Sequence, residues 1–268
     1  MRKGAPRPPW CVRLCHARGA WLMVCLGLAL PVSGQMGRAD PATVCVEGDG
    51  PHIRSVCLVD VPGAPAYGHA VLGATPEWDL LRVTWGSDGR VSEFRQDAHV
   101  FEDIAPRVVD LDGDGLPKII VVQSSFTRGA RLVVLRTTDG LSVTATPYIG
   151  QRNRWLAPIG AADLDGDGNA EIAYIDRPHL AKRLRIWRYQ DGALTPVLDH
   201  DGLTNHAIGE DWITGGMRSC GDAPPEMIVL SADRRRVIAA RFDGQKLHTR
   251  DLGPYKSRTQ VERLVACS

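Results

Sequence analysis

A repeat of about 52 residues constrains the fold of this chain more than any other feature of its sequence. Four times, a strand-like apolar run is followed by Asp-Gly and a second strand-like run, and the Asp-Gly pairs begin at Asp88, Asp139, Asp191 and Asp243. Asp-Gly between such runs is a strong signal for a tight β-hairpin, because glycine accepts the positive backbone angle that the turn requires. The sequence therefore predicts one hairpin in each of four repeated units.

Each unit also carries strand-like runs upstream of its hairpin. Apolar runs at 118–122, 171–175 and 226–230 precede the last three hairpins, and a further short run precedes each of these. Units of four short antiparallel strands cannot bury both faces alone, and stacking them radially gives a β-propeller. We therefore expect an all-β fold, a propeller of four to five blades with about 52 residues per four-stranded blade. A β-sandwich and an open solenoid of hairpins are the structural alternatives.

The two ends of the repeat array suggest how it closes. The segment ERLVACS at 262–268 resembles the first strand of a fifth unit, and residues 43–61 could supply its missing strands. Closure by strands from both termini would remove exposed sheet edges, which invite aggregation. Five blades are therefore favoured over four.

The N-terminal segment has the features of an export signal. Five basic residues lie within the first 18, and the apolar run 20–30 that follows ends at Pro31. This run is far shorter than the roughly 20 apolar residues that span a bilayer. We predict a signal peptide at 1–39, a single domain at 40–268, and a periplasmic or secreted protein with no membrane span.

Four cysteines lie outside this signal, namely Cys45, Cys57, Cys220 and Cys267. An exported protein meets an oxidising environment, where four thiols allow two disulfides in three pairings. We favour Cys45 with Cys57, which are close in sequence, and Cys220 with Cys267. A zinc site is the alternative, but the short CxxC spacing that would support it is absent.

The charge balance and the absence of common motifs exclude several functional classes. Lys and Arg number 32 against 31 Asp and Glu, which gives no electrostatic reason to attract nucleic acid or anionic lipid. No GxSxG, Walker, HExxH or CxxCH motif occurs, so the sequence does not indicate the common hydrolase, nucleotide-binding, zinc-protease or haem classes.

One aspartate-rich segment has the ligand pattern of a cation-binding loop. In DLDGDGNAE the side chains of Asp163, Asp165, Asp167 and Glu171 and the carbonyl of Asn169 can each supply oxygen. Calcium takes six to eight oxygen ligands at roughly 2.3 to 2.6 Å, whereas zinc prefers nitrogen and sulfur. An EF-hand is excluded, because position twelve of the loop is not glutamate and β-forming residues follow it.

DLDGDGNAE resembles the calcium loops of FG-GAP repeats in integrin α-subunit propellers and of the related bacterial VCBS repeats, which read DxDxDGxxD or DxDxDGxxE. The resemblance covers roughly residues 80–268 and implies a propeller with calcium bound between blade strands. In this family such loops mainly stiffen the propeller. The resemblance thus implies calcium as cofactor without establishing a ligand-binding or catalytic role.

Two other loops depart from this pattern. In DLDGDGLPK the residues Asp110, Asp112 and Asp114 and the carbonyl of Leu116 are retained, but Lys118 replaces the closing carboxylate. We expect calcium to bind there weakly or not at all, with the lysine as a neutralising group.

The third copy of the loop, RSCGDAPPE, is aligned through Glu226. In this alignment Arg218 and Cys220 take the places of the first two aspartates, so we expect no metal there.

Two polar connections are weaker candidates for function. Residues 200–212 contain His200, Asp201, His206, Glu210, Asp211 and Trp212, which could serve acid–base chemistry or bind a sugar, but a solvated loop is favoured. The segment QRNRWLAP at 151–158 could offer arginine and tryptophan to an acidic partner, although packing of Trp155 explains it as well.

The sequence as a whole predicts an exported, calcium-binding β-propeller. We expect it to act as a monomer and as an adhesion-like module for a protein or glycan ligand, not as an enzyme. The alternative is a propeller enzyme that acts on an extracellular carbohydrate or phosphoester. A cluster of mutually oriented carboxylates and histidines around a pocket would favour that alternative.

Overall fold

The computed structural model describes residues 42–48, 50–136 and 141–267, all within one compact unit, Asp40–Ser268. The predicted signal peptide at 1–39 lies outside the described residues. Among the described residues, no helix is long and apolar enough to cross a membrane. The Asp139 turn also falls outside them, although the strands on both sides of it pair as a hairpin.

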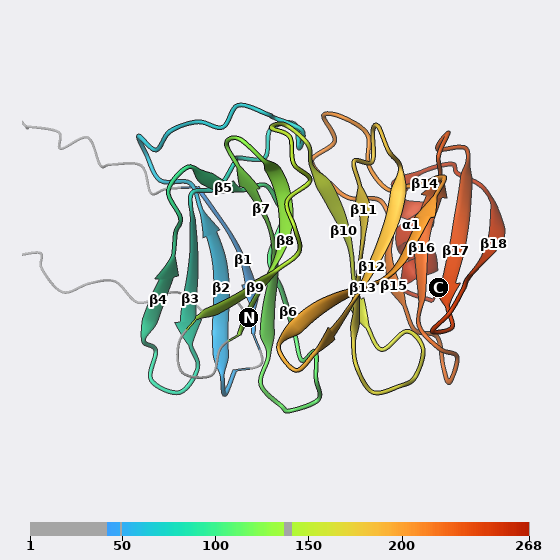
Figure 1. Ribbon diagram of the computed structural model, residues 1–268, viewed down its shortest axis with the longest axis horizontal. Helices are drawn as coiled ribbons and strands as arrows, with labels where there is room; N and C mark the ends of the chain where they lie inside the picture. Colours follow the sequence, from blue (N-terminus) through green and yellow to red (C-terminus); the bar gives the residue numbers. More distant parts are fainter. Residues whose placement is uncertain (1–41, 49, 137–140, 268) are drawn as a thin grey trace, which may run out of the picture. The chain divides into compact units, whose positions relative to one another are not determined.

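The described residues form four antiparallel sheets, which follow one another in chain order from blue to red in Figure 1. The first sheet contains β1 (Thr43–Glu47), β2 (Ile53–Val59), β3 (Leu80–Trp85) and β4 (Val91–Phe94). The second contains β5 (His99–Phe101), β6 (Arg107–Val109), β7 (Lys118–Ser125), β8 (Gly129–Arg136) and β9 (Ser142–Ala145). The third contains β10 (Leu156–Ala162), β11 (Glu171–Asp176), β12 (Arg183–Gln190) and β13 (Ala193–Asp201). The fourth contains β14 (Leu203–Thr204), β15 (Gly216–Arg218), β16 (Glu226–Ser231), β17 (Arg236–Phe242) and β18 (Leu247–Pro254), and α1 (Arg258–Val265) follows.

The predicted Asp-Gly hairpins form wherever their turns are described. At Asp191 and Gly192 both residues have positive φ, 52° and 76°, as the preferred two-residue hairpin turn requires. This turn joins β12 to β13, and the turns at Asp88 and Asp243 likewise join the last two strands of the first and fourth sheets.

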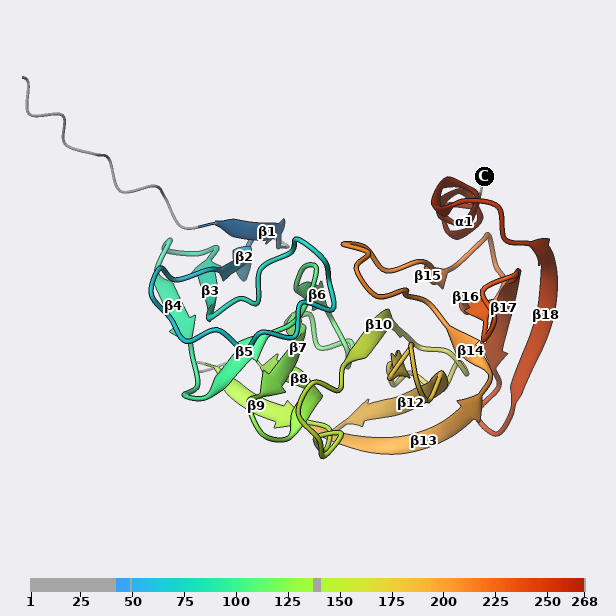
Figure 2. The same ribbon diagram turned by 90° about the horizontal axis from the view of Figure 1, so that it is seen from above.

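Consecutive sheets pack face to face through alternate residues of their inner strands. In β7, Ile119 and Val121 belong to a core shared with the first sheet, whereas Ile120 and Val122 belong to a core shared with the third. A third core joins the third and fourth sheets. Both faces of the inner strands are therefore covered, and every residue of β7 and β11 is buried. Figure 2 shows the consecutive sheets side by side.

The C-terminal segment differs from the prediction. Residues read as the first strand of a fifth unit form the helix α1, in which Val261 is buried and packs on the second face of the fourth sheet. The Ser257 side chain caps the helix by accepting a hydrogen bond from the Gln260 N–H, 3.2 Å away. The apolar residues Val261, Leu264 and Val265 follow helical spacing, and so short a run does not distinguish helix from strand in sequence.

The N-terminal strands also have a different place from the one expected. Residues 43–59 form β1 and β2, which pair with β3 and complete the first sheet. The described residues therefore form four sheets, and the favoured arrangement of five units closed by strands from both termini is not formed.

Candidate metal centre

The two DLDGDG segments occupy the same position in successive sheets. One lies between β6 and β7, where Val109 pairs with Lys118, and the other between β10 and β11, where Ala162 pairs with Glu171. The equal spacing makes the ninth residue of each segment the first residue of a fully buried strand. The identity of that residue decides what each loop can hold.

In the second loop the backbone folds around Asp163. Its carboxylate accepts hydrogen bonds from the N–H groups of Gly166 at 2.7 Å and Gly168 at 3.0 Å. Both glycines have positive φ, which explains why glycine alternates with aspartate in this segment. One carboxylate oxygen each of Asp163, Asp165 and Glu171 lies within 4.8 Å of the others. The loop therefore brings two of its own carboxylates close to a third from the start of β11.

Glu171 anchors the cluster from inside the sheet. Its side chain is fully buried and accepts a hydrogen bond from the Leu164 N–H at 2.9 Å. Burial raises the pKa of its carboxyl, and the Arg188 guanidinium opposes that shift. Arg188 is the cross-strand partner of Glu171 on β12.

The Arg188 guanidinium reaches three of the cluster's carboxylates. It lies 2.6 Å from Glu171 and 3.0 Å from Asp167, and it also contacts Asp165. Its pKa is raised above the usual value, first by the hydrogen bond to Glu171. The spacing of residues along the sequence does not indicate Arg188, because its pairing with Glu171 depends on the strand register of β11 and β12, which the intervening turn sets.

The donor set of this loop fits a hard divalent cation. All predicted ligands are oxygens, and one guanidinium offsets only one of the four carboxylates of Asp163, Asp165, Asp167 and Glu171. Calcium is bound in proteins by such carboxylate and carbonyl oxygens. The Asn169 side chain donates to the Asp167 carboxylate at 3.1 Å, which leaves the Asn169 carbonyl as the fifth predicted donor.

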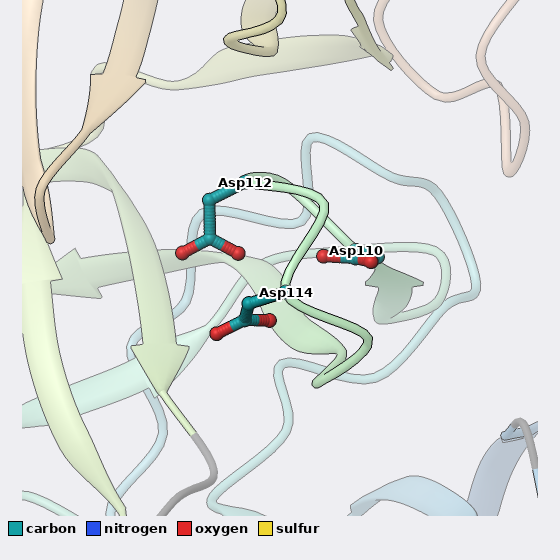
Figure 3. Close-up of side chains that lie close together, drawn as sticks. All are labelled: Asp110, Asp112 and Asp114. Carbon is teal, nitrogen blue, oxygen red and sulfur yellow. The ribbon is translucent and has the colours of Figure 1, made fainter.

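In the first loop a lysine ammonium lies among the predicted ligands. Figure 3 shows Asp110, Asp112 and Asp114 close together on that loop. The Lys118 Nζ lies 2.7 Å from Asp114 Oδ1 and 2.8 Å from the Leu116 carbonyl oxygen, contacts Asp112, and is 3.9 Å from Asp110. These four residues are the ones that the sequence pattern predicts as metal ligands. The ammonium therefore takes the position of the cation.

Lys118 is held there as a charged group. Its side chain is only 3% exposed, and burial by itself lowers the pKa of an ammonium. Hydrogen bonds to Asp112 and Asp114 outweigh burial and raise the pKa of Lys118 above its usual value. The lysine is thus protonated at neutral pH and lies where a metal ion would bind, although one carboxylate oxygen each of Asp110, Asp112 and Asp114 lies within 4.8 Å of the others, as a metal site requires.

In the third copy of the loop, an arginine pairs with the glutamate at the closing position. Arg218 pairs with Glu226 across β15 and β16, and its Nε donates to the glutamate at 3.0 Å. The sequence alignment placed Arg218 at the first aspartate position, and the strand register corrects this. Arg218 corresponds to Ala162, so the loop is one residue shorter than its two counterparts.

The cysteines pair as the sequence favoured. Cys45 is bonded to Cys57 across β1 and β2, and Cys220 is bonded to Cys267, which ties the shortened loop to the residues after α1. The alternative of a zinc site on these cysteines is therefore wrong. Two disulfides indicate an oxidising, extracellular environment.

The structure places Asp201 apart from His206 and Glu210, and His206 contacts Glu210 only at its backbone carbonyl. Asp201 lies at the end of β13 and pairs with Arg183 at 2.6 Å, whereas His206 is buried and Glu210 pairs with Arg234 at 2.7 Å. They do not form one acid–base site.

Trp155, from the other polar connection, packs in the core. It is 2% exposed and donates through Nε1 to the Glu102 carbonyl at 2.8 Å.

The comparisons with known proteins agree with the repeat seen in the loops and strands. Residues 110–174, from the first acidic loop into β11, match the FG-GAP-like repeat family. The chain contains an FG-GAP-like repeat. The match includes both DLDGDG segments and the strands from β7 to β10. A search of curated proteins found no match.

Proposed function

We propose that this protein is an exported β-propeller-like binding module that calcium stabilises at the loop Asp163–Glu171. The observation that carries the calcium assignment is the cluster of carboxylate oxygens from Asp163, Asp165 and Glu171, which lies at the start of a buried strand within the FG-GAP-like repeat. The two disulfides support export, and the balanced charge gives no reason to expect a nucleic-acid partner. The partner class remains a protein or glycan ligand.

Contacts between connecting segments support a closed, radial arrangement of the sheets. The connection between β2 and β3, residues 60–79, reaches the connection between β14 and β15, where the Gly209 N–H donates to the Val71 carbonyl at 3.1 Å. Thus a segment of the first sheet contacts a segment of the fourth. We propose that the four sheets act as four blades, with α1 covering the outer face of the last.

Calcium should raise the melting temperature of the wild-type protein by about 5–10 °C over its value in EDTA. A ligand that binds only the native state at 100 times its Kd adds about 2.7 kcal/mol, and 1 kcal/mol shifts the midpoint of a domain of this size by about 2–4 °C. Thermal unfolding followed by circular dichroism measures this shift. An unchanged midpoint at millimolar calcium would exclude calcium stabilisation.

An enzyme acting on extracellular carbohydrate or phosphoester is a second candidate, and one dyad favours it. The His69 Nδ1 lies 2.7 Å from Oε1 of the buried Glu102, whose other oxygen accepts from Ser124. A carboxylate that orients an imidazole is the usual arrangement behind a general base. If this function holds, a panel of glycoside and phosphoester substrates will show turnover that His69→Asn abolishes. If no substrate of the panel is turned over, the enzyme candidate is excluded and only the binding function stands.

A further inference from the structure

A cavity of ≈270 Å³ lies at the opposite end of the strands from the acidic loops. Glu171 begins β11 at the acidic loop, whereas the residues that follow Asp176 at its other end line the cavity. The connection between β2 and β3 and the residues just before β10 complete the wall. This volume is slightly below the roughly 300–1,000 Å³ of pockets for drug-sized ligands, so the cavity suits a group the size of one amino-acid residue.

The cavity offers positive charge without a facing carboxylate. Arg154 and Arg177 line it, and no acidic side chain does among the residues that the structure describes. Arg177 is neutralised by Asp176 at 2.8 Å. Within the described segments, the Arg154 guanidinium donates a hydrogen bond only to the backbone carbonyl of Asn153, at 2.9 Å. Arg154 is therefore the donor available to an anionic ligand.

The carboxylates behind the wall are already engaged. Glu102 binds His69 and Ser124, and Glu77 accepts backbone hydrogen bonds from Gly68, His69 and Ala70. Neither of these carboxylates therefore neutralises the positive charge of Arg154. An anion is the group that would satisfy it.

The rim of the cavity is apolar. Leu180 and Ile208 line it and are 63% and 74% exposed, and they are two of the four large hydrophobic side chains exposed in the described residues. Such side chains gathered beside a cavity favour a ligand with an apolar body. Beneath them, Trp155 is buried and offers little of its ring face for stacking on a sugar.

His179 lines the cavity, and its contact with the buried His206 behind it determines which of its nitrogens can accept a hydrogen bond. The His206 Nε2 lies 2.9 Å from the Glu210 carbonyl, which can only accept, so this nitrogen donates. His206 is neutral because burial lowers its pKa, and its Nδ1 must then accept from His179 Nε2 at 2.8 Å. His179 is left with Nδ1 as an acceptor that has no partner in the described part of the chain. Burial, with smaller contributions from neighbouring basic groups, lowers the pKa of His179 to about 4.

We propose that this cavity binds the C-terminal residue of a peptide that ends in an apolar side chain. Arg154 takes the terminal carboxylate, His179 Nδ1 accepts the peptide N–H, and the rim of Leu180 and Ile208 covers the side chain. This inference rests on the proposed binding function and names its ligand as a protein C-terminus. The glycan alternative is less favoured, because Trp155, the one tryptophan among the described residues that line the cavity, is buried.

The test uses N-acetyl-leucine as the probe and follows the His179 ring resonances of the wild-type protein by NMR. We expect the acid to shift these resonances and to raise the His179 pKa, because it adds negative charge beside the imidazole. Three control compounds should each bind at least about 10-fold more weakly than N-acetyl-leucine. N-acetyl-leucinamide lacks the negative charge, N-acetylglycine lacks the apolar side chain, and glucuronate lacks the peptide unit. Arg154→Met should weaken the binding of N-acetyl-leucine by a similar factor. Arg235→Met, which changes a side chain that is 84% exposed, should leave this binding unchanged.

Equal binding of the acid and the amide would overturn the proposal. So would His179 resonances that do not move up to about a 50-fold molar excess of N-acetyl-leucine at millimolar protein. Stronger binding of glucuronate would also overturn it and assign the cavity to an acidic sugar. The titration is repeated in EDTA, with the melting temperature recorded separately. Binding of the probe without any calcium response would refute the calcium part of the proposed function and leave the cavity assignment standing.

Discussion

Glu171→Gln is expected to abolish the calcium-induced rise in melting temperature and to destabilise the protein even without calcium. Glutamine keeps the shape of the side chain but removes the buried charge that pairs with Arg188 at 2.6 Å. Breaking a buried ion pair lowers the free energy of unfolding by about 3–5 kcal/mol. The loss should be smaller here, about 1–3 kcal/mol, because Arg188 keeps Asp165 and Asp167 as partners and burial already disfavours the ionised form of Glu171. Urea denaturation in EDTA and in calcium measures both effects.

Glu226→Gln is the matched control for this substitution. Glu226 also begins the strand that follows the loop, β16, and pairs with an arginine, Arg218, but that loop lacks the three alternating aspartates. This variant should lose stability and keep its full response to calcium. If Glu171→Gln retains the calcium response, or if Glu226→Gln loses it, the donor set at Asp163–Glu171 is not the calcium site.

Lys118→Glu is expected to create a second calcium site and to make the protein depend on calcium for folding. The substitution restores the closing carboxylate to DLDGDGLPK and places four acidic groups where an ammonium now lies between three. Without calcium, the unpaired buried charge should destabilise the protein by about 3 kcal/mol or more. With calcium, most of this loss should be recovered. Isothermal titration calorimetry should count one more ion per chain than in the wild type.

Lys118→Met separates the loss of the ammonium from the gain of a ligand. Methionine fills much of the same buried space but carries no charge and no carboxylate. It should destabilise the protein in EDTA and bind an additional ion more weakly than Lys118→Glu does. A Lys118→Glu protein that binds no more calcium than the wild type would show that the first loop cannot be shaped into a cation site.

Features set by local sequence were predictable in this chain. The Asp-Gly turns follow from the backbone requirement of a hairpin, and the loop lengths follow from the spacing of acidic and apolar residues. The same local chemistry identified Lys118 as the residue that distinguishes the two acidic loops. It did not show that the lysine is buried among its four oxygen partners, because burial depends on the packing of the neighbouring sheets.

Features set by distant contacts were not predictable. Arg188 reaches the acidic loop through strand register, and the cavity near Arg154 depends on residues 60–79, which cross from the first sheet to segments of the later ones. The helix α1 was mistaken for a strand because its apolar run is short and its cap, Ser257, was not recognised. Each of these depends on which surfaces meet, and the periodicity of one chain segment does not contain that information.

The number of calcium ions bound by the wild-type protein tests the central claim most directly. The claim is that two nearly identical loops differ in what neutralises them: a metal ion at Asp163–Glu171, and the Lys118 ammonium at Asp110–Leu116. Isothermal titration of the calcium-free protein should therefore give one high-affinity ion per chain. Two ions of similar affinity would show that the lysine does not exclude the metal, and none would show that the complete donor set does not bind it.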